Sequence, residues 1–272
     1  MQAADKWYDE ELQALAEDSH TSKELFIFIY CFQSLCAKPK STHGSVSKQL
    51  RVSAWQLLDF NGNKIVSLAE TGKWVGERLI NFFADQDNKA MGVGAEEAKL
   101  LYKRFYPCFI RAFLDAADFG AATKVTQKGG GKVYGNTKTT GDDYVQFREF
   151  RLLCTYLCVY AAIYEAFGNV DGGGKGIDAT DDRRISKDEW TTNGNLLKGH
   201  PLLSLSISAN GDPSMIFDAM DGDGKGKVLL AEFSTYIEDY EFSLKTRWGK
   251  LLNAGEPVAD SAGGAVAAAA AV

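Results

Sequence analysis

Apolar residues recur three or four positions apart along most of this 272-residue chain, which places them on one face of a helix. The pattern predicts helices over residues 4–18, 22–36, 47–58, 68–85, 96–119, 146–170, 187–197 and 202–208, then one that begins near Pro213 and one from residue 233 towards 252. The segment 146–170 is apolar on nearly all sides, so we expect that helix to be buried. The sequence therefore predicts an all-α fold.

Residues 221–232 (DGDGKGKVLLAE) separate two predicted helices and have the spacing of an EF-hand calcium loop. We call this segment loop 4. Asp221, Asp223 and Glu232 fall at positions 1, 3 and 12, where carboxylates supply most of the charge that a hard cation needs. Lys227 at position 7 contributes only its backbone carbonyl. The sequence thus predicts a Ca²⁺ site in loop 4.

One position of loop 4 departs from the pattern. Lys225 occupies position 5, where an oxygen ligand is expected and an ammonium cannot bind calcium. We expect a water molecule to replace that ligand while the lysine turns to solvent, so that calcium binds more weakly than with Asp or Asn there. Gly226 at position 6 and Val228 at position 8 suit a sharp turn and a short β-bridge between loops.

The same spacing occurs at residues 59–70 (DFNGNKIVSLAE), which we call loop 1. Its predicted side-chain ligands are Asp59, Asn61, Asn63 and Glu70. Lys64 takes position 6, where a non-glycine residue at positive φ costs on the order of 1 kcal/mol. Only two of the four ligands carry charge, so we interpret loop 1 as a degenerate loop, kept for pairing or for weak calcium binding.

Residues 138–149, here loop 2, end like such a loop, with Val145 at position 8 and Glu149 at position 12. Lys138 at position 1 is incompatible with calcium. We expect loop 2 to bind no metal and to pair with loop 1.

Two registers are open for the third loop. FGNVDGGGKG (167–176) resembles FDAMDGDGKG (217–226), which starts the loop at Asp171, but Glu189 is then too far away to close it. Counting back from Glu189 gives residues 178–189, here loop 3, with Arg183 at the glycine position. In that register the predicted ligands are Asp178, Thr180, Asp182, the backbone carbonyl of Arg184, and Glu189.

Composition narrows the function classes. A hydrophobic content of 45% and a charged content of 24% are typical of soluble globular proteins, and a net charge of −6 argues against nucleic-acid binding. The five cysteines lie in apolar helical stretches, which indicates buried thiols in a reducing compartment, not disulfides or a zinc site. The apolar runs 25–32 and 152–164 are too short to span a bilayer, and no signal peptide is visible. We expect a cytoplasmic protein with no transmembrane segment.

These segments suggest an organisation in four parts. Residues 1–45 form a helical N-terminal extension, with a partner-binding arm as the alternative. Residues 46–150 hold loops 1 and 2, and residues 151–254 hold loops 3 and 4. The Ala/Gly-rich residues 255–272 form a disordered tail.

The order of these parts resembles the flagellar calcium-binding proteins (calflagins) of protists. The resemblance lies in VQFREFRLLCTY (145–156), in the long helix between loops 2 and 3, and in a final loop followed by a small-residue tail. It implies an EF-hand fold of two paired-loop lobes with calcium at the later loops, and a calcium sensor in the flagellum or cilium. That family's N-terminal acylation signal is missing, because residue 2 is Gln2, and this argues against membrane contact.

Two functions remain open. In the first, calcium exposes an apolar surface to a flagellar or cytoskeletal protein partner, through Phe233, Tyr236, Ile237 and Tyr240. In the second, the protein is a structural subunit of an axonemal or other large assembly, with little or no calcium switching. We predict no enzymatic activity, since the chain has no recognisable nucleophile, phosphate-loop or hydrolase motif.

Overall fold

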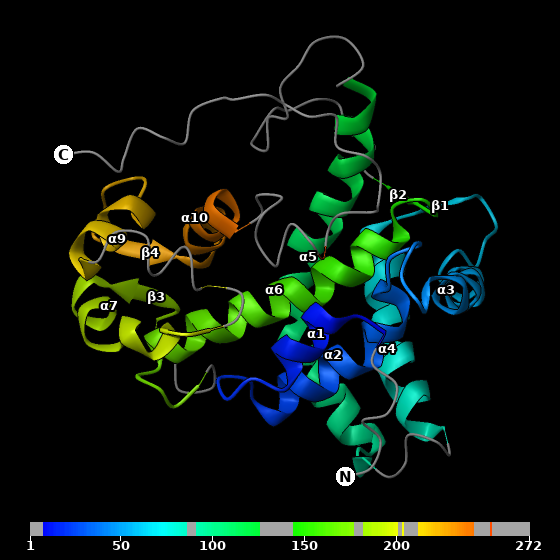
Figure 1. Cartoon of the computed structure of the whole chain (residues 1–272), viewed down its shortest axis with the longest axis horizontal. Helices are drawn as coiled ribbons and strands as arrows, with labels where there is room; N and C mark the ends of the chain where they lie inside the picture. Colours follow the sequence, from blue (N-terminus) through cyan, green and yellow to red (C-terminus); the bar gives the residue numbers. More distant parts are fainter. Residues whose placement is uncertain are drawn as a thin grey trace.

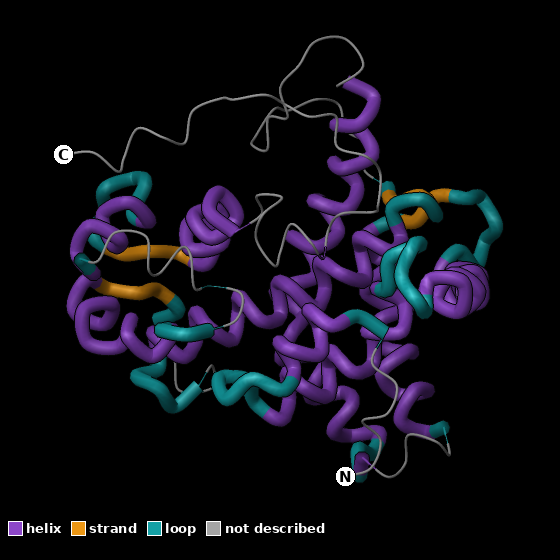
Figure 2. The backbone as a smooth tube through the Cα atoms, viewed as in Figure 1, coloured by secondary structure: helices purple, strands orange, loops and turns teal. Residues whose placement is uncertain are grey.

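The structure is a computed structural model that describes residues 8–85, 91–125, 144–176, 182–200, 203, 212–241 and 251. Helices dominate it and the strands have two or three residues each, which confirms the all-α fold (Figure 1, Figure 2). The elements in order are α1 (Glu10–Ala16), α2 (Lys23–Cys36), α3 (Gly44–Leu58), β1 (Ile65–Val66), α4 (Leu68–Ala84), α5 (Ala95–Val125), β2 (Val145–Gln146), α6 (Phe150–Asp171), β3 (Arg184–Ser186), α7 (Lys187–Asn193), the 3-10 helix η5 (Gly194–Leu197), α9 (Pro213–Met220), β4 (Lys227–Leu229) and α10 (Leu230–Glu241).

The short strands join the loops in pairs, as expected. β1 pairs antiparallel with β2, with Val66 opposite Val145, so loop 1 is joined to loop 2. β3 pairs antiparallel with β4, with Ile185 opposite Val228, so loop 3 is joined to loop 4. All four of these side chains are fully buried. The apolar residue at position 8 of each loop therefore anchors the pairing.

Helix α6 lies between the two strand pairs and packs on α2 and α5, with α7, η5 and α10 at its far end (Figure 1). The predicted burial is confirmed, since 94% of its most apolar 18-residue window is inside the protein. With 22 residues α6 extends beyond the run 152–164 that the sequence analysis judged too short to span a bilayer. By length and composition α6 alone among the described helices qualifies to cross a membrane, a criterion that buried core helices also meet.

The N-terminal helices are part of this core. Leu12 and Leu15 on α1, and Phe28 and Phe32 on α2, have no exposed surface, and α2 packs along α6. Ser22 is the N-cap of α2, and its hydroxyl accepts a hydrogen bond from the Leu25 amide at 3.1 Å.

The residue preceding this cap has a different role from the one that sequence reasoning suggests. Thr21, with Glu24 three positions on, fits a capping box. In the structure the Thr21 hydroxyl donates instead to the Leu15 carbonyl at 2.7 Å, and so ties α1 to α2.

The C-terminal end of α2 is buried and is capped by two arginines. The last carbonyls of a helix have no partner within the helix, so burial requires donors from elsewhere. Each donor lies within 3.2 Å of its acceptor: Arg51 donates to the carbonyls of Leu35 and Ala37, and Arg151 to that of Cys36. These two arginines are buried and come from α3 and α6, and the negative end of the helix dipole favours their charge. Arg78 on α4 donates to the Cys31 carbonyl, further back in the helix.

All five cysteines are buried and free, which agrees with the predicted buried thiols. Burial raises the pKa of the Cys31 thiol to about 12, so this thiol stays protonated at neutral pH.

Several predicted boundaries moved. α5 continues to Val125, past the expected end at residue 119, and α6 begins at Phe150 instead of residue 146. The predicted helix 202–208, the continuation of α10 beyond residue 241 and the tail 255–272 lie outside the described residues.

The buried position of α2 gives a stability prediction. Phe28→Ala removes a ring with no exposed surface, packed 4.7 Å from the Phe105 ring centroid, and should lower the free energy of unfolding by about 3–5 kcal/mol. The matched control Phe60→Ala removes a ring that is 65% exposed and should change it by about 0.5 kcal/mol or less. Urea denaturation measures both, and equal effects would contradict the packing of the N-terminal helices in the core.

Candidate metal site

Loop 4 brings three carboxylates together between two helices. Asp221 is the C-cap residue of α9, and Glu232 lies in the first turn of α10. Asp221, Asp223 and Glu232 each offer an oxygen atom, and these three atoms lie within 4.8 Å of one another. Two oxygens on one Ca²⁺ lie no more than about 5 Å apart, because each Ca–O distance is about 2.3–2.6 Å. The spacing of the carboxylates therefore fits a calcium ion.

Backbone turns aim these side chains into the loop. Gly224 and Gly226 have φ angles of 67° and 75°, the left-handed region that glycine adopts without strain. The Asp221 carboxylate accepts hydrogen bonds from the backbone amides of Lys225 at 3.0 Å and Gly226 at 2.8 Å. The carboxylate at position 1 is thus held inward by the loop that it begins.

The side chain of Lys225 is 77% exposed, which agrees with the expectation that it turns to solvent, but its ammonium also binds back to the loop. Its ammonium nitrogen donates to Asp223 Oδ2 at 2.6 Å, within the loop. This ion pair raises the pKa of Lys225 and lowers that of Asp223. Position 5 therefore carries a tethered cation that competes with a metal ion for the carboxylate at position 3. A lysine two residues after an acid in a tight turn was the sequence signal for this contact.

The glutamate at position 12 has the same second role in all four loops. In each one it accepts a hydrogen bond from the backbone amide at position 9, and in loops 1 and 3 this bond is part of a capping box for the helix that follows. The four distances are 2.8 Å for Ser67 to Glu70, 2.8 Å for Gln146 to Glu149, 2.7 Å for Ser186 to Glu189, and 2.9 Å for Leu229 to Glu232. Ligation by both oxygens of such a glutamate requires this hydrogen bond to weaken.

Loop 1 assembles its predicted ligands but closes on itself. Lys64 has a φ of 68°, and its amide donates to Asp59 Oδ2 at 3.1 Å. The Asn61 amide donates to Glu70 Oε1 at 2.9 Å, and Asn63 Oδ1 accepts from the Ile65 amide. Asp59 is largely buried, and its Oδ1 has no hydrogen-bond partner. That buried oxygen fits a cation ligand, whereas the Asn61–Glu70 bond holds the loop without one.

In loop 3 the described residues favour the register 178–189. Arg183, at position 6, has a positive φ of 58°, and β3 covers positions 7 to 9, from Arg184 onward. The predicted ligands Asp178 and Thr180 lie outside the described residues. Asp182 forms an ion pair with the ammonium of Lys227 in loop 4. This contact joins position 5 of one loop to position 7 of the other, which sequence reasoning missed.

The predicted partner-binding residues lie inside the protein in this conformation. Phe233 and Ile237 have no exposed surface, Tyr236 is 6% exposed, and the Phe233 ring lies 5.6 Å from that of Phe167 on α6. The side chain of Tyr240 is outside the described part. A partner can reach these residues only if α10 separates from α6.

The chain matches no family model and no curated protein sequence. The resemblance to the calflagins therefore stays a prediction. Among the described residues, the loop 4 carboxylates are also the only cluster of three histidine, cysteine or acidic side chains close enough to share a metal ion. Loop 4 is accordingly the candidate site on which a function can be argued.

The backbone of loop 1 gives a second stability prediction. Lys64→Gly should raise the free energy of unfolding by about 1 kcal/mol, because glycine adopts the observed positive φ without the Cβ clash. The control Lys73→Gly, at an exposed position inside α4, should lower it by about 1 kcal/mol. A loss of stability in both variants would show that position 6 carries no strain. Thermal or urea denaturation without added metal distinguishes these outcomes.

Proposed function

We propose that this protein is a calcium-binding protein of the EF-hand type and that loop 4 is its main Ca²⁺ site. The observation that carries the proposal is the cluster of Asp221, Asp223 and Glu232, whose oxygens lie within 4.8 Å of one another. The backbone carbonyl of Lys227 at position 7 completes the protein ligands. A bound calcium ion would supply the positive charge that balances these carboxylates.

The arrangement of the loops supports the EF-hand assignment. Each of loops 1 and 4 has helices on both sides and positive φ at positions 4 and 6. The β-bridges join the loops two by two, and each position 12 glutamate accepts a hydrogen bond from the backbone amide at position 9. Loops 1 and 3 are secondary sites in this proposal, and loop 2 is a partner for pairing only.

We further propose a sensor function, in which α10 is the part that responds. Glu232 and the apolar residues Phe233 and Ile237 belong to the same short helix. When both oxygens of Glu232 become ligands, the hydrogen bond to the Leu229 amide is released and the start of α10 shifts. Such a shift separates Phe233 and Ile237 from α6 and offers them to a protein partner. The cytoplasmic and flagellar location rests on the sequence expectations alone.

The alternative, a structural subunit with little switching, is favoured by the internal bonds of the loops. Lys225 already neutralises Asp223, and Asn61 already binds Glu70, so both loops are closed without a metal. If this alternative holds, the protein keeps its partner when calcium is chelated. If the protein is a sensor, chelation releases the partner.

The calcium site is tested by Glu232→Gln, which keeps the shape of the side chain and removes its charge. Calorimetric titration of the unmodified chain should show saturable calcium binding and a change in tryptophan emission. The variant should lose its strongest site, with an affinity reduced roughly a hundredfold or more, on the order of 3 kcal/mol. The matched control Glu149→Gln, at position 12 of loop 2, should bind calcium like the unmodified chain. No binding by the unmodified chain at millimolar calcium would refute the proposal.

The competing lysine gives a prediction of opposite sign. Lys225→Asn removes the ammonium from Asp223 and adds an amide oxygen at position 5, so calcium affinity should rise roughly tenfold. Lys198→Asn, an equal charge change at an exposed position outside the four loops, controls for net charge. The same gain in both variants, or none in Lys225→Asn, would show that Lys225 does not compete with the metal. The measurement is the same titration at fixed ionic strength.

A further inference from the structure

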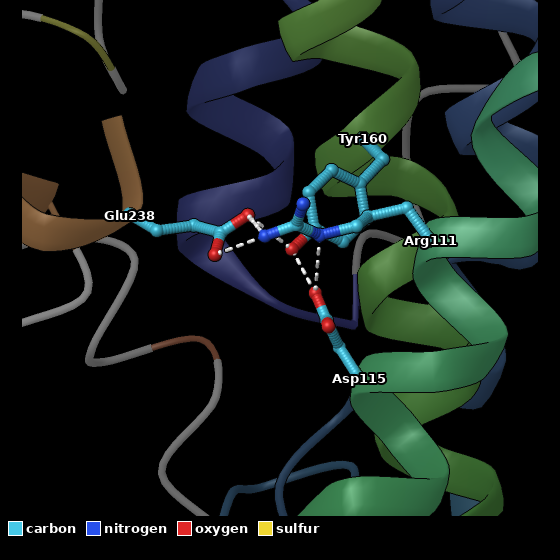
Figure 3. A network of polar contacts seen from close by, with 4 residues as sticks. All are labelled: Arg111, Asp115, Tyr160 and Glu238. Atoms are coloured by element: carbon cyan, nitrogen blue, oxygen red, sulfur yellow. Dashed lines mark hydrogen bonds and ion pairs between the residues drawn. The ribbon is translucent and has the colours of Figure 1, made fainter. Parts of the chain in front are cut away.

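Four polar side chains join α10 to α5 and α6 (Figure 3). Arg111 and Asp115 come from α5, Tyr160 from α6 and Glu238 from α10. Arg111 Nη2 donates to both oxygens of Glu238, each at 2.7 Å, and Arg111 Nε lies 3.3 Å from Asp115 Oδ2. Tyr160 is 3% exposed, and its hydroxyl touches both carboxylates.

The contacts of Tyr160 require one more proton than ionised groups provide. Its Oη lies 2.7 Å from Glu238 Oε1 and makes a short hydrogen bond to Asp115 Oδ2. A tyrosine hydroxyl has a single proton, and an ionised carboxylate only accepts. If both carboxyl groups were ionised, one of these two oxygen–oxygen contacts would hold no proton. The geometry is satisfied when one carboxyl group is protonated and donates to Tyr160, which donates to the other.

The surroundings of Glu238 agree with a held proton. Burial and, to a smaller extent, the charge of Asp115 raise its pKa to about 7, against the lowering effects of Arg111 and of the hydrogen bond to Tyr160. Burial also raises the pKa of Asp115. Among the described residues, the charged or titratable side chains that face Glu238 are Arg111, Asp115 and Tyr160. The elements α9 and β4 also pack on α10, but Asp218 and Lys227 pair with Lys187 and Asp182 instead.

We propose that Arg111, Asp115, Tyr160 and Glu238 form a proton-dependent latch that holds α10 against α5 and α6, and so regulates the calcium site at the start of that helix. Glu232 and Glu238 are on the same helix, so a latch at Glu238 opposes the shift of α10 that accompanies calcium binding in the proposed function. The effect of the latch on calcium binding rests on the proposed function. The existence of the latch does not, because it is argued from the contacts among the four side chains alone.

The sign follows from proton uptake. Freed from its partners, Glu238 ionises near its ordinary pKa of 4.5, whereas in the latch it ionises near 7. Between these values docking of α10 takes up a proton, so the docking equilibrium falls about tenfold per pH unit as pH rises. Below pH 4.5 the contribution is fully present, and above pH 7 it is lost and the equilibrium no longer depends on pH. The released proton goes to water.

The test compares Glu238→Gln with Asp239→Asn, an exposed neighbour on the same helix. Glutamine donates to Tyr160 as the protonated acid does but cannot ionise. Between pH 5 and pH 7, the folding equilibrium constant of the unmodified chain should fall more than that of Glu238→Gln, by a factor of up to about a hundred. Asp239→Asn should behave like the unmodified chain. If all three chains show the same pH dependence, the latch holds no proton and the proposal is wrong.

The proton can also be detected in the unmodified chain, so that the result does not depend on the stability of a variant. With ¹³C-labelled glutamate carboxyl groups, one NMR resonance of the unmodified chain should titrate near pH 7. The absence of this resonance from Glu238→Gln assigns it to Glu238. Titration of every glutamate below about pH 5.5 would overturn the proposal.

A calcium titration at two pH values distinguishes the proposed calcium function from the proposed latch. Calcium affinity should rise at least tenfold from pH 5.5 to 7.5 in the unmodified chain, relative to Glu238→Gln, because the docked state that opposes the calcium-driven shift of α10 weakens as the proton is lost. Absence of calcium binding in every chain, with the NMR titration intact, would refute the calcium function and leave the latch. Calcium binding with the same pH dependence in both chains would refute regulation by the latch.

Discussion

The burial of α6 is the constraint on which the rest of this structure depends. Its first residue, Phe150, follows the last residue of loop 2, and its last residue, Asp171, precedes loop 3. One continuous helix thus carries a loop pair at each end, and almost every side of it is covered. A helix without a polar face cannot shift without exposing apolar surface. Movement in either loop pair must therefore be taken up by outer helices that pack on α6, such as α10.

The need to cover α6 explains why the N-terminal helix α2 is buried and why arginines from other helices cap its end. Two paired-loop units leave one side of so apolar a helix open, and α2 covers that side. This places the C-terminal carbonyls of α2 in the interior, where unsatisfied polar groups are costly. Arg51 and Arg151 satisfy them from two different helices. The described N-terminal residues 8–45 thus contribute to the core from which the loops project.

The sequence predicted those features that depend on local spacing. The spacing of apolar residues and the positions of turn-forming residues predicted most helices. The β-branched residues at position 8 of the loops, such as Val228, predicted the strand pairs. Contacts between distant segments left no such signal. Glu238 and Arg111 are 127 positions apart, and no motif connects them. Side-chain direction was predicted in part. Lys225 is exposed as expected, but its spacing two residues after Asp223 also allowed the ammonium to fold back onto that carboxylate, and the sequence analysis did not use this signal.

The ion pair inside loop 4 and the hydrogen bond inside loop 1 affect how strongly each loop would bind calcium. A bare cluster of carboxylates gains the full attraction of a cation, whereas a cluster that already holds a counter-charge gains only the difference. Lys225 gives loop 4 such a counter-charge, and Asn61 gives loop 1 a neutral hydrogen bond at the corresponding place. In the proposed function, calcium binding would be an exchange of one partner for another, which weakens affinity and leaves the metal-free loop closed. A closed metal-free loop fits the proposed sensor, in which α10 stays docked until calcium rises, and the proposed latch at Glu238 would hold α10 in that position.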